Sequence, residues 1–179
     1  MQYSDPFSRM PRELLILRHA KSDWDSAAAS DFDRPLAKRG KNDAPAVGAW
    51  LYREAMVPDY IVSSPAQRAR ETALKVCKRL DLKKKQIVWD SAIYEADLGG
   101  LLGVLGRVPA DAATVLLVGH NPGLEELVRY LTGGDHEEPE DGKLLPTAAL
   151  ARLEMPDDWS QLEAGCAAVL SLVRPKQLK

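Results

Sequence analysis

The sequence contains few of the residues that form disulfides or bind metals. Its 179 residues include two cysteines and three histidines. Cys77 and Cys166 are too far apart for a CxxC motif and too few for a disulfide scaffold or a zinc site, so free and mostly buried thiols are expected. Neither an HxH nor an HExxH motif occurs. These absences argue against a conventional metal site.

Long apolar runs and a strong net charge are also missing. No run approaches the roughly 20 apolar residues that a membrane-spanning helix needs. Residues 1–12, MQYSDPFSRMPR, are polar, contain proline and do not resemble a signal peptide. The formal net charge of -2 gives no global attraction for nucleic acid or an anionic membrane. We therefore expect a cytoplasmic protein that binds neither nucleic acid nor membranes.

Apolar residues are sufficient for one core. The chain is 45% apolar and 28% charged, which fits a single globular domain over residues 13–175, preceded by an N-terminal extension, residues 1–12. Short apolar runs alternate with segments of helical periodicity, which predicts a three-layer α/β sandwich with a mostly parallel sheet between helices. Strands are expected at 13–17, 60–62, 86–89, 114–118, 149–155 and 166–173, and helices at 38–55, 65–80, 98–105 and 122–132.

Two helix starts are marked by capping residues. Ser64 is a good N-cap, followed by Pro65 at the first helical position and Gln67 at the third, which matches a capping box. Asn121 and Pro122 repeat the cap-and-proline pattern. Both helix N-termini are therefore expected to direct backbone donors and positive dipoles toward the ends of the preceding strands.

Polar residues follow three of the predicted strands. Arg18 and His19 end the first strand, Arg68 lies in the helix after the second, and His120 follows the apolar strand at 114–118. In open parallel sheets the carboxyl ends of the strands form the binding crevice. A lone histidine at such a position is usually structural, but two of them with two arginines leave a structural and a functional role equally open.

The chemistry of this set favours an anion. A guanidinium beside a divalent cation would be repelled by a few kcal/mol even at an effective dielectric constant near 20. Two arginines instead match the oxygens of phosphate, and an imidazole can attack a phosphoryl group to form a phosphohistidine. His120, if protonated, would join Arg18 and Arg68 in neutralising the transition state, so neither a metal nor another cofactor is required.

Three separated motifs resemble those of the histidine phosphatase superfamily. They are Leu17-Arg18-His19-Ala20-Lys21-Ser22, the segment Ser64-Pro65-Ala66-Gln67-Arg68-Ala69-Arg70-Glu71-Thr72-Ala73, and Val118-Gly119-His120-Asn121-Pro122. Within that superfamily the sequence is most similar to the small bacterial SixA-like phosphohistidine phosphatases. The resemblance covers about residues 13–173, keeps the order of the motifs, and implies a phosphoglycerate mutase-like fold.

The resemblance also implies roles for individual residues. His19 would be the nucleophile, Arg18, Arg68 and His120 would form the phosphate pocket, and Glu95 lies where larger members place their acid. Ala20 departs from the wider Arg-His-Gly signature but is usual in the SixA-like branch. The short segment between Glu95 and Thr114 leaves no room for the insertion that caps the site in mutases. A mutase activity is therefore disfavoured.

Three functions remain open. The first is hydrolysis of phosphohistidine on a phosphotransfer protein by a monomeric enzyme. The second is hydrolysis of small phosphate esters, and the third is phosphate binding without turnover. Of the other notable residues, Lys83-Lys84-Lys85 is expected to be a solvated turn, His136 to be exposed, and the four tryptophans to pack.

Overall fold

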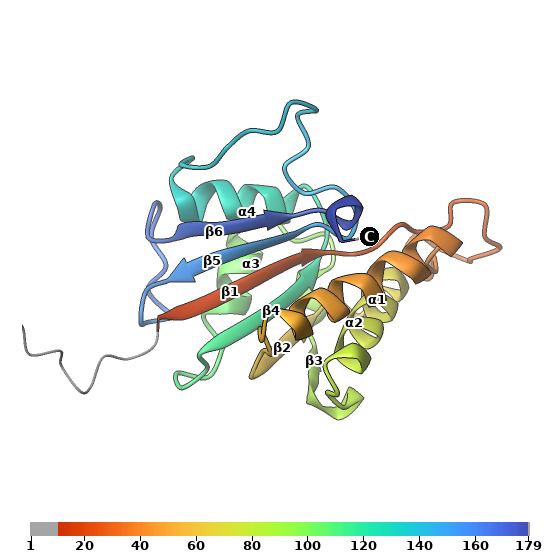
Figure 1. The fold of residues 1–179 in the computed structure, drawn as a ribbon, viewed down its shortest axis with the longest axis horizontal. Coiled ribbons are helices and arrows are strands. Elements are labelled where there is room, and N and C mark those ends of the chain that lie inside the picture. The colour runs from red at the N-terminus through yellow and green to blue at the C-terminus, as the bar shows by residue number, and fades with distance from the viewer. Residues whose placement is uncertain (1–10, 179) are drawn as a thin grey trace, which may run out of the picture.

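The computed structural model describes residues 11–178. Residues 1–10 of the predicted N-terminal extension lie outside this range. Six strands form one sheet and four helices cover it (Figure 1). In chain order the elements are β1 (Arg12–Arg18), α1 (Lys38–Arg53), β2 (Tyr60–Ser63), α2 (Gln67–Arg79), β3 (Ile87–Trp89), α3 (Leu98–Leu105), β4 (Thr114–Gly119), α4 (Gly123–Thr132), β5 (Leu150–Met155) and β6 (Ala168–Val173).

The sheet is mixed, in the order β3-β2-β4-β1-β5-β6. Its first four strands are parallel, as the alternation of strands and helices predicts. β5 pairs antiparallel with β1, and β6 pairs antiparallel with β5. The parallel part contains the strands that the three motifs follow, so the carboxyl ends of β2, β4 and β1 lie side by side.

The core consists of two apolar layers, one on each face of the sheet. Leu14 and Ile16 of β1 face one layer, together with the buried side chains of α3 and α4. Leu15 and Leu17 face the other, which is covered by α1 and α2. Successive side chains of a strand point to opposite faces. A strand covered on both faces is therefore apolar throughout, which explains the continuous run LLIL.

The two predicted helix caps are wrong. α2 begins at Gln67, with Ala66 as the N-cap residue and no side-chain cap. α4 begins at Gly123, after Pro122. Ser64 and Asn121 instead lie in the turns before these helices. Their side chains are free to take other partners, which they find in the site described below.

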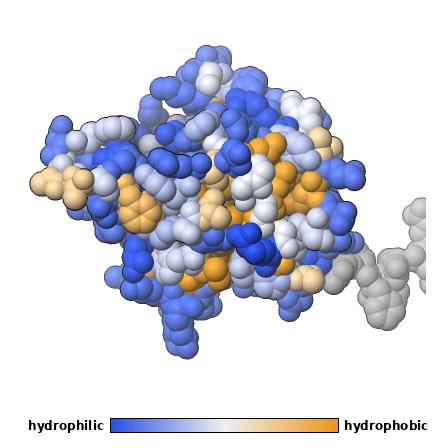
Figure 2. Space-filling view, turned by 180° about the vertical axis from the view of Figure 1, so that it is seen from behind, coloured by the Kyte–Doolittle hydropathy of each residue, from blue (hydrophilic) through white to orange (hydrophobic). Residues whose placement is uncertain are grey.

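Two expectations about individual side chains also fail. Trp24 is 72% exposed and does not pack into the core, whereas Trp159 is buried. The His136 side chain is buried, because its ring lies within hydrogen-bond distance of Thr132 and Glu138. The surface on the side opposite to that of Figure 1 is largely hydrophilic, with an apolar patch near its middle (Figure 2). Within residues 11–178 no helix combines the length and apolarity required to cross a membrane.

Two glycines hold site-forming loops against helices. A Cβ at Gly40 in α1 would lie 2.2 Å from the backbone oxygen of Lys21, and one at Gly123 in α4 would lie 2.3 Å from that of Ala96. Both distances are far shorter than a van der Waals contact. Only a residue without a side chain allows the loop after β1 and the loop before α3 to approach so closely.

We predict that Gly123→Ala destabilises the protein. The new methyl group must displace the backbone at Ala96, and overpacking of this kind costs about 1 to 3 kcal/mol. Gly99→Ala is the matched control, since a Cβ at this α3 position meets no atom closer than 3.6 Å. Alanine should stabilise that helix by up to about 1 kcal/mol. Urea unfolding of both variants tests the difference, and equal stability would contradict the proposed close contact.

Candidate active site

The register of the parallel strands brings the motifs together. Arg18 at the end of β1 lies opposite Gly119 at the end of β4, and Ser63 at the end of β2 lies opposite Val118. The His19 backbone N–H donates to the Gly119 carbonyl oxygen at 3.0 Å. The residues that directly follow β1, β2 and β4, namely His19, Ser64 and His120, are therefore neighbours. The rings of His19 and His120 have centroids 5.2 Å apart.

His19 is buried and its ring is held by two hydrogen bonds. Its Nδ1 lies 2.8 Å from the carbonyl oxygen of Ala20, which can only accept, so Nδ1 carries the proton. Nε2 is then unprotonated, and it accepts a hydrogen bond from Nε of Arg68 at 3.4 Å. The residue is 7% exposed. The lone pair of Nε2 consequently faces the guanidinium of Arg68 and not the apolar core.

His120 is oriented by Ser64. Its Nε2 lies 2.8 Å from Oγ of Ser64, which also accepts from the backbone N–H of Ala66. The ring of Tyr94 packs edge-on against that of His120, with centroids 5.5 Å apart. The serine that was predicted to cap α2 thus positions a site histidine instead.

The arginines of the motifs are anchored through part of their donor sets. Nη1 of Arg18 donates to the Leu145 carbonyl oxygen at 3.0 Å, while its buried Nε has no partner within residues 11–178. Arg68 is 6% exposed. Its Nη1 donates to the backbone oxygen of Asp31 at 2.7 Å, and its Nη2 to the carboxylate of the same residue at 3.0 Å. These contacts fix both guanidinium groups next to His19.

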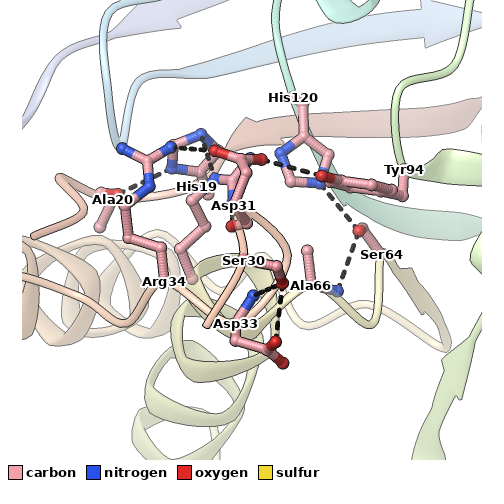
Figure 3. Close-up of polar contacts among 11 residues, drawn as sticks. His19, Ala20, Ser30, Asp31, Asp33, Arg34, Ser64, Ala66, Tyr94 and His120 are labelled. Carbon is pink, nitrogen blue, oxygen red and sulfur yellow. Dashed lines mark hydrogen bonds and ion pairs between the residues drawn. The ribbon is translucent and has the colours of Figure 1, made fainter. Parts of the chain in front are cut away.

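Sequence reasoning missed a second set of site residues, which lies in the loop between β1 and α1 and near α3. The carboxylate of Asp31 accepts from Arg68, from Nη2 of Arg34 at 2.7 Å and from the hydroxyl of Tyr94 at 2.9 Å. Figure 3 shows Asp31 between Arg34 on one side and Tyr94 with His120 on the other. Only the folded loop brings these residues together, because none belongs to a strand end.

Arg34 adds a third guanidinium to the site, paired with Asp31 through Nη2 alone. It is 8% exposed, and its Nε and Nη1 are buried without a hydrogen-bond partner within the described residues. Its guanidinium carbon lies 3.6 Å above the centre of the Trp24 ring. Arg34 lines one cavity together with His19 and Arg18, so its positive charge favours an anion there.

The pKa values of both site histidines are lowered, so both rings are neutral at pH 7 unless a bound anion raises them. Burial is the main cause that lowers the pKa of His19 to about 3; the hydrogen bond from its ring to Ala20 opposes the shift, and the nearby His120, Arg68 and Arg18 contribute to it. Burial also lowers the pKa of His120 to about 4, helped by Arg68 and Arg18 and opposed by Asp31. Neutral His19 keeps the lone pair that a nucleophile needs.

Glu95 lies at the rim and not inside the cluster. It lines a cavity of about 490 Å³ together with Asp31, Arg68, Tyr94 and His120. Its side chain is exposed and its backbone is left-handed, with φ at 55°. The structure therefore brings Arg18, His19, Arg68 and His120 together, whereas Glu95 faces the same cavity from its edge.

A second cavity of about 300 Å³ adjoins the first. It is lined by Arg18, His19, Arg34, Trp24 and Lys21, among others, and shares Arg68, His120 and Asn121 with the first. Within residues 11–178 no cluster of three or more His, Cys, Asp or Glu side chains could hold a metal ion. Three arginines around a neutral imidazole fit a phosphate or another tetrahedral oxyanion.

Comparisons of sequence agree with this chemistry. The sequence profile of the histidine phosphatase superfamily (branch 1) matches residues 14–108. An uncharacterized protein of Mycobacterium tuberculosis is 32% identical over 164 residues, which cover 89% of this chain and 100% of that protein. A 2,3-bisphosphoglycerate-dependent phosphoglycerate mutase of Bartonella bacilliformis is 29% identical over 97 residues, covering 53% of this chain and 47% of the mutase.

Comparisons of structure give the same family. The protein histidine phosphatase SixA complexed with tungstate superposes with a TM-score of 0.78 and 25% identity, covering 93% of this chain and 99% of SixA. A SixA protein of Nakamurella multipartitia superposes with a TM-score of 0.79 and 26% identity, covering 92% and 96%. These overlaps bear out the predicted SixA-like resemblance and the phosphoglycerate mutase-like fold.

We predict that the two histidines make the protein less stable in acid. Their pKa values of about 3 and about 4 lie below the ordinary 6.5, so between pH 6.5 and 4 the unfolded chain binds more protons. The free energy of unfolding should therefore fall as the pH is lowered, by at most about 1.4 kcal/mol per pH unit for each histidine.

Urea unfolding at pH 7, 6 and 5 measures this dependence. The double variant His19→Gln, His120→Gln should lose most of the slope in this range, because it lacks the two histidines whose pKa values are lowered. Identical slopes for the wild type and the double variant would show that the site histidines are not held neutral.

Proposed function

Because this chain belongs to the histidine phosphatase superfamily (branch 1), we propose that it is a phosphohistidine phosphatase that transfers a phosphoryl group onto His19 and then to water. One observation carries the proposal. The Nε2 lone pair of a buried, neutral imidazole faces a cavity lined by three arginines. A phosphoryl group held by those arginines would lie next to a nucleophile whose other nitrogen is already fixed by Ala20.

The proposed reaction has two steps. In the first, Nε2 of His19 attacks phosphorus, the bond from phosphorus to the leaving nitrogen breaks, and that nitrogen takes a proton from solvent water. In the second, a water oxygen attacks the phosphohistidine, the bond from phosphorus to Nε2 breaks, and inorganic phosphate leaves. The Ala20 carbonyl accepts from Nδ1 throughout, which stabilises the positive charge on the ring while Nε2 is bonded to phosphorus.

The arginines supply the electrostatic stabilisation. We propose that Arg18, Arg68 and Arg34 neutralise the charge on the equatorial phosphoryl oxygens and that His120 donates to one of them. The dianion raises the pKa of His120 from its low value in the unoccupied site, so the ring becomes protonated when the substrate binds. Neither a metal nor another cofactor takes part in this scheme.

Asp31 is proposed as a positioning residue. Its carboxylate pairs with Arg68 and Arg34 at 3.0 and 2.7 Å, and the pairs offset the repulsion between the two guanidinium groups. The arginines are thereby preorganised before the phosphoryl group arrives, so no reorganisation is needed when charge develops.

The substrate class follows from the open site. Only α3 and short loops lie between Tyr94 and β4, so no inserted subdomain covers the histidines. The relative that binds tungstate, a tetrahedral oxyanion, is a protein histidine phosphatase. We therefore propose a phosphohistidine side chain of a phosphotransfer protein in the cytoplasm as the substrate. Glu95 at the rim and the partial match to a mutase favour small phosphate esters as the second candidate.

We expect His19→Ala to abolish turnover and the covalent intermediate while phosphate binding stays measurable. Arg68→Ala should weaken both turnover and phosphate binding, because this variant loses a positive charge but keeps the nucleophile. Rapid-quench trapping in excess chelator should give acid-labile phosphate on the wild type and none on the His19 variant. Equal trapping on both proteins would place the nucleophile elsewhere, and loss of wild-type activity in chelator would indicate a metal.

A substrate panel separates the two candidate functions. Expulsion of an alkoxide needs a proton from a general acid, whose help is commonly worth about 10² to 10⁴ in rate. With an exposed Glu95 as the candidate acid, phosphohistidine and phosphoramidate should exceed alkyl phosphates in kcat/KM by at least about 10². Glu95→Gln should reduce ester hydrolysis more than phosphohistidine hydrolysis. Sugar phosphates as good as phosphohistidine, or equal losses in the variant, would favour a metabolite phosphatase.

A further inference from the structure

An exposed tryptophan stands at the mouth of the site. Trp24 is 72% exposed, although it lines the same cavity as His19 and Arg18. It is one of five large apolar or aromatic side chains that are exposed within residues 11–178, and the others, Tyr52, Val57, Val88 and Leu170, do not line either cavity of the site. Fold stability does not account for an indole in this position, because it buries little of its surface.

The Trp24 ring is nevertheless held in place. Ser22 and Leu36 form an antiparallel bridge, and the backbone N–H of Asp23 donates to the Pro35 carbonyl oxygen at 2.8 Å. This pairing sets Trp24 against Arg34, whose guanidinium covers one face of the indole. Arg34 is itself fixed by Asp31. One face of the Trp24 ring is therefore covered by Arg34, and the remainder of the ring is exposed to solvent. Because the ring is already held in place, a binding partner would pay little conformational entropy to order it.

The opposite side of the mouth is acidic. Glu95, Asp97 and Glu126 line the larger cavity and are all exposed, and we call them the acidic rim. The two cavities meet at Arg68, His120 and Asn121, so the phosphoryl position lies between the indole and the acidic rim. A small phosphate ester would leave both sides uncovered. Only a larger substrate could contact both Trp24 and the acidic rim at once.

We propose that Trp24 is the docking contact for the protein that carries the phosphorylated side chain. An apolar side chain beside the phosphohistidine packs on the free part of the indole, and basic groups of the same partner face the acidic rim. This inference rests on the proposed function and adds the surface that recognises the carrier. Tryptophan is enriched among the residues that dominate binding at protein interfaces, whereas surface carboxylates chiefly steer and orient the partner.

The test compares two substrates with the same leaving group. One is a phosphotransfer protein carrying phosphohistidine, and the other is free N-phosphohistidine. The ratio of their kcat/KM values isolates recognition of the carrier from the chemistry at His19. Trp24→Ala should lower this ratio at least about tenfold through KM for the protein, as expected for an interface hot spot. Trp24→Phe, which keeps a ring on Arg34, should lower it less. Tyr52→Ala removes an aromatic side chain that is 63% exposed on α1 and should leave the ratio unchanged.

Each other outcome overturns the inference. If Trp24→Ala reduces both substrates equally and weakens inhibition by inorganic phosphate to the same degree, Trp24 acts only through Arg34. If the variant instead loses activity selectively on aryl or nucleoside phosphates, the indole stacks on a small aromatic leaving group. If the wild type hydrolyses sugar phosphates as well as either phosphohistidine substrate, the proposed function is refuted. The docking role of Trp24 is then refuted too, because it rests on that function. An active wild type with an unchanged ratio in Trp24→Ala refutes the docking contact alone.

Discussion

The parallel pairing of β1 with β4 is the constraint on which the site depends. Arg18 lies opposite Gly119 in this pair, and the hydrogen bond from the His19 N–H to the Gly119 carbonyl extends the pairing by one residue. Two histidines that are 101 positions apart in the chain, at 19 and 120, thus become neighbours. A slip by one residue would turn each side chain to the other face of the sheet. The close packing of Leu14 and Ile16 in one apolar layer, and of Leu15 and Leu17 in the other, opposes that slip.

The charged side chains at this edge of the sheet determine which ligand the site favours. Three arginines line the site beside His19 and His120. Burial, with Arg68 and Arg18 contributing, lowers the pKa of both imidazoles well below the ordinary value. The half-exposed carboxylate of Asp31 keeps two of these arginines in place. With three arginines beside the carboxylate of Asp31, the site has an excess of positive charge. A phosphoryl dianion offsets that charge, so binding and the protonation of His120 are coupled in the proposed mechanism.

The same loops that complete the phosphate pocket also shape its surroundings. Gly40 and Gly123 let the loops after β1 and before α3 approach the helices closely, and these loops carry Asp31 and Tyr94. Within residues 11–178 the mouth of the site extends from Trp24 to the acidic rim. An open site of this type supports the proposed substrate, a phosphorylated side chain on a protein.

The sequence by itself determined the fold class and the four motif residues. Continuous apolar runs, without alternating polar residues, identified the parallel strands. Because parallel strands run in the same direction, the polar residues that follow them were expected to meet at one edge of the sheet. Glu95 could be placed near the site only through the family resemblance, and the structure locates it at the rim. The caps at Ser64 and Asn121 were predicted wrongly, because local propensity for capping is weaker than the tertiary contacts that these side chains make with His120, Leu145 and Glu125.

Tertiary structure alone decided the contributions of Asp31, Arg34, Tyr94 and Trp24. These residues lie in irregular segments, where neither periodicity nor a strand end marks their position. Their meeting depends on long-range contacts, such as the hydroxyl of Tyr94 on Asp31, 63 residues earlier in the chain. The charge state of His120 was likewise beyond sequence reasoning, since a pKa depends on burial and on the distances to other charges. Both quantities exist only once the chain has folded.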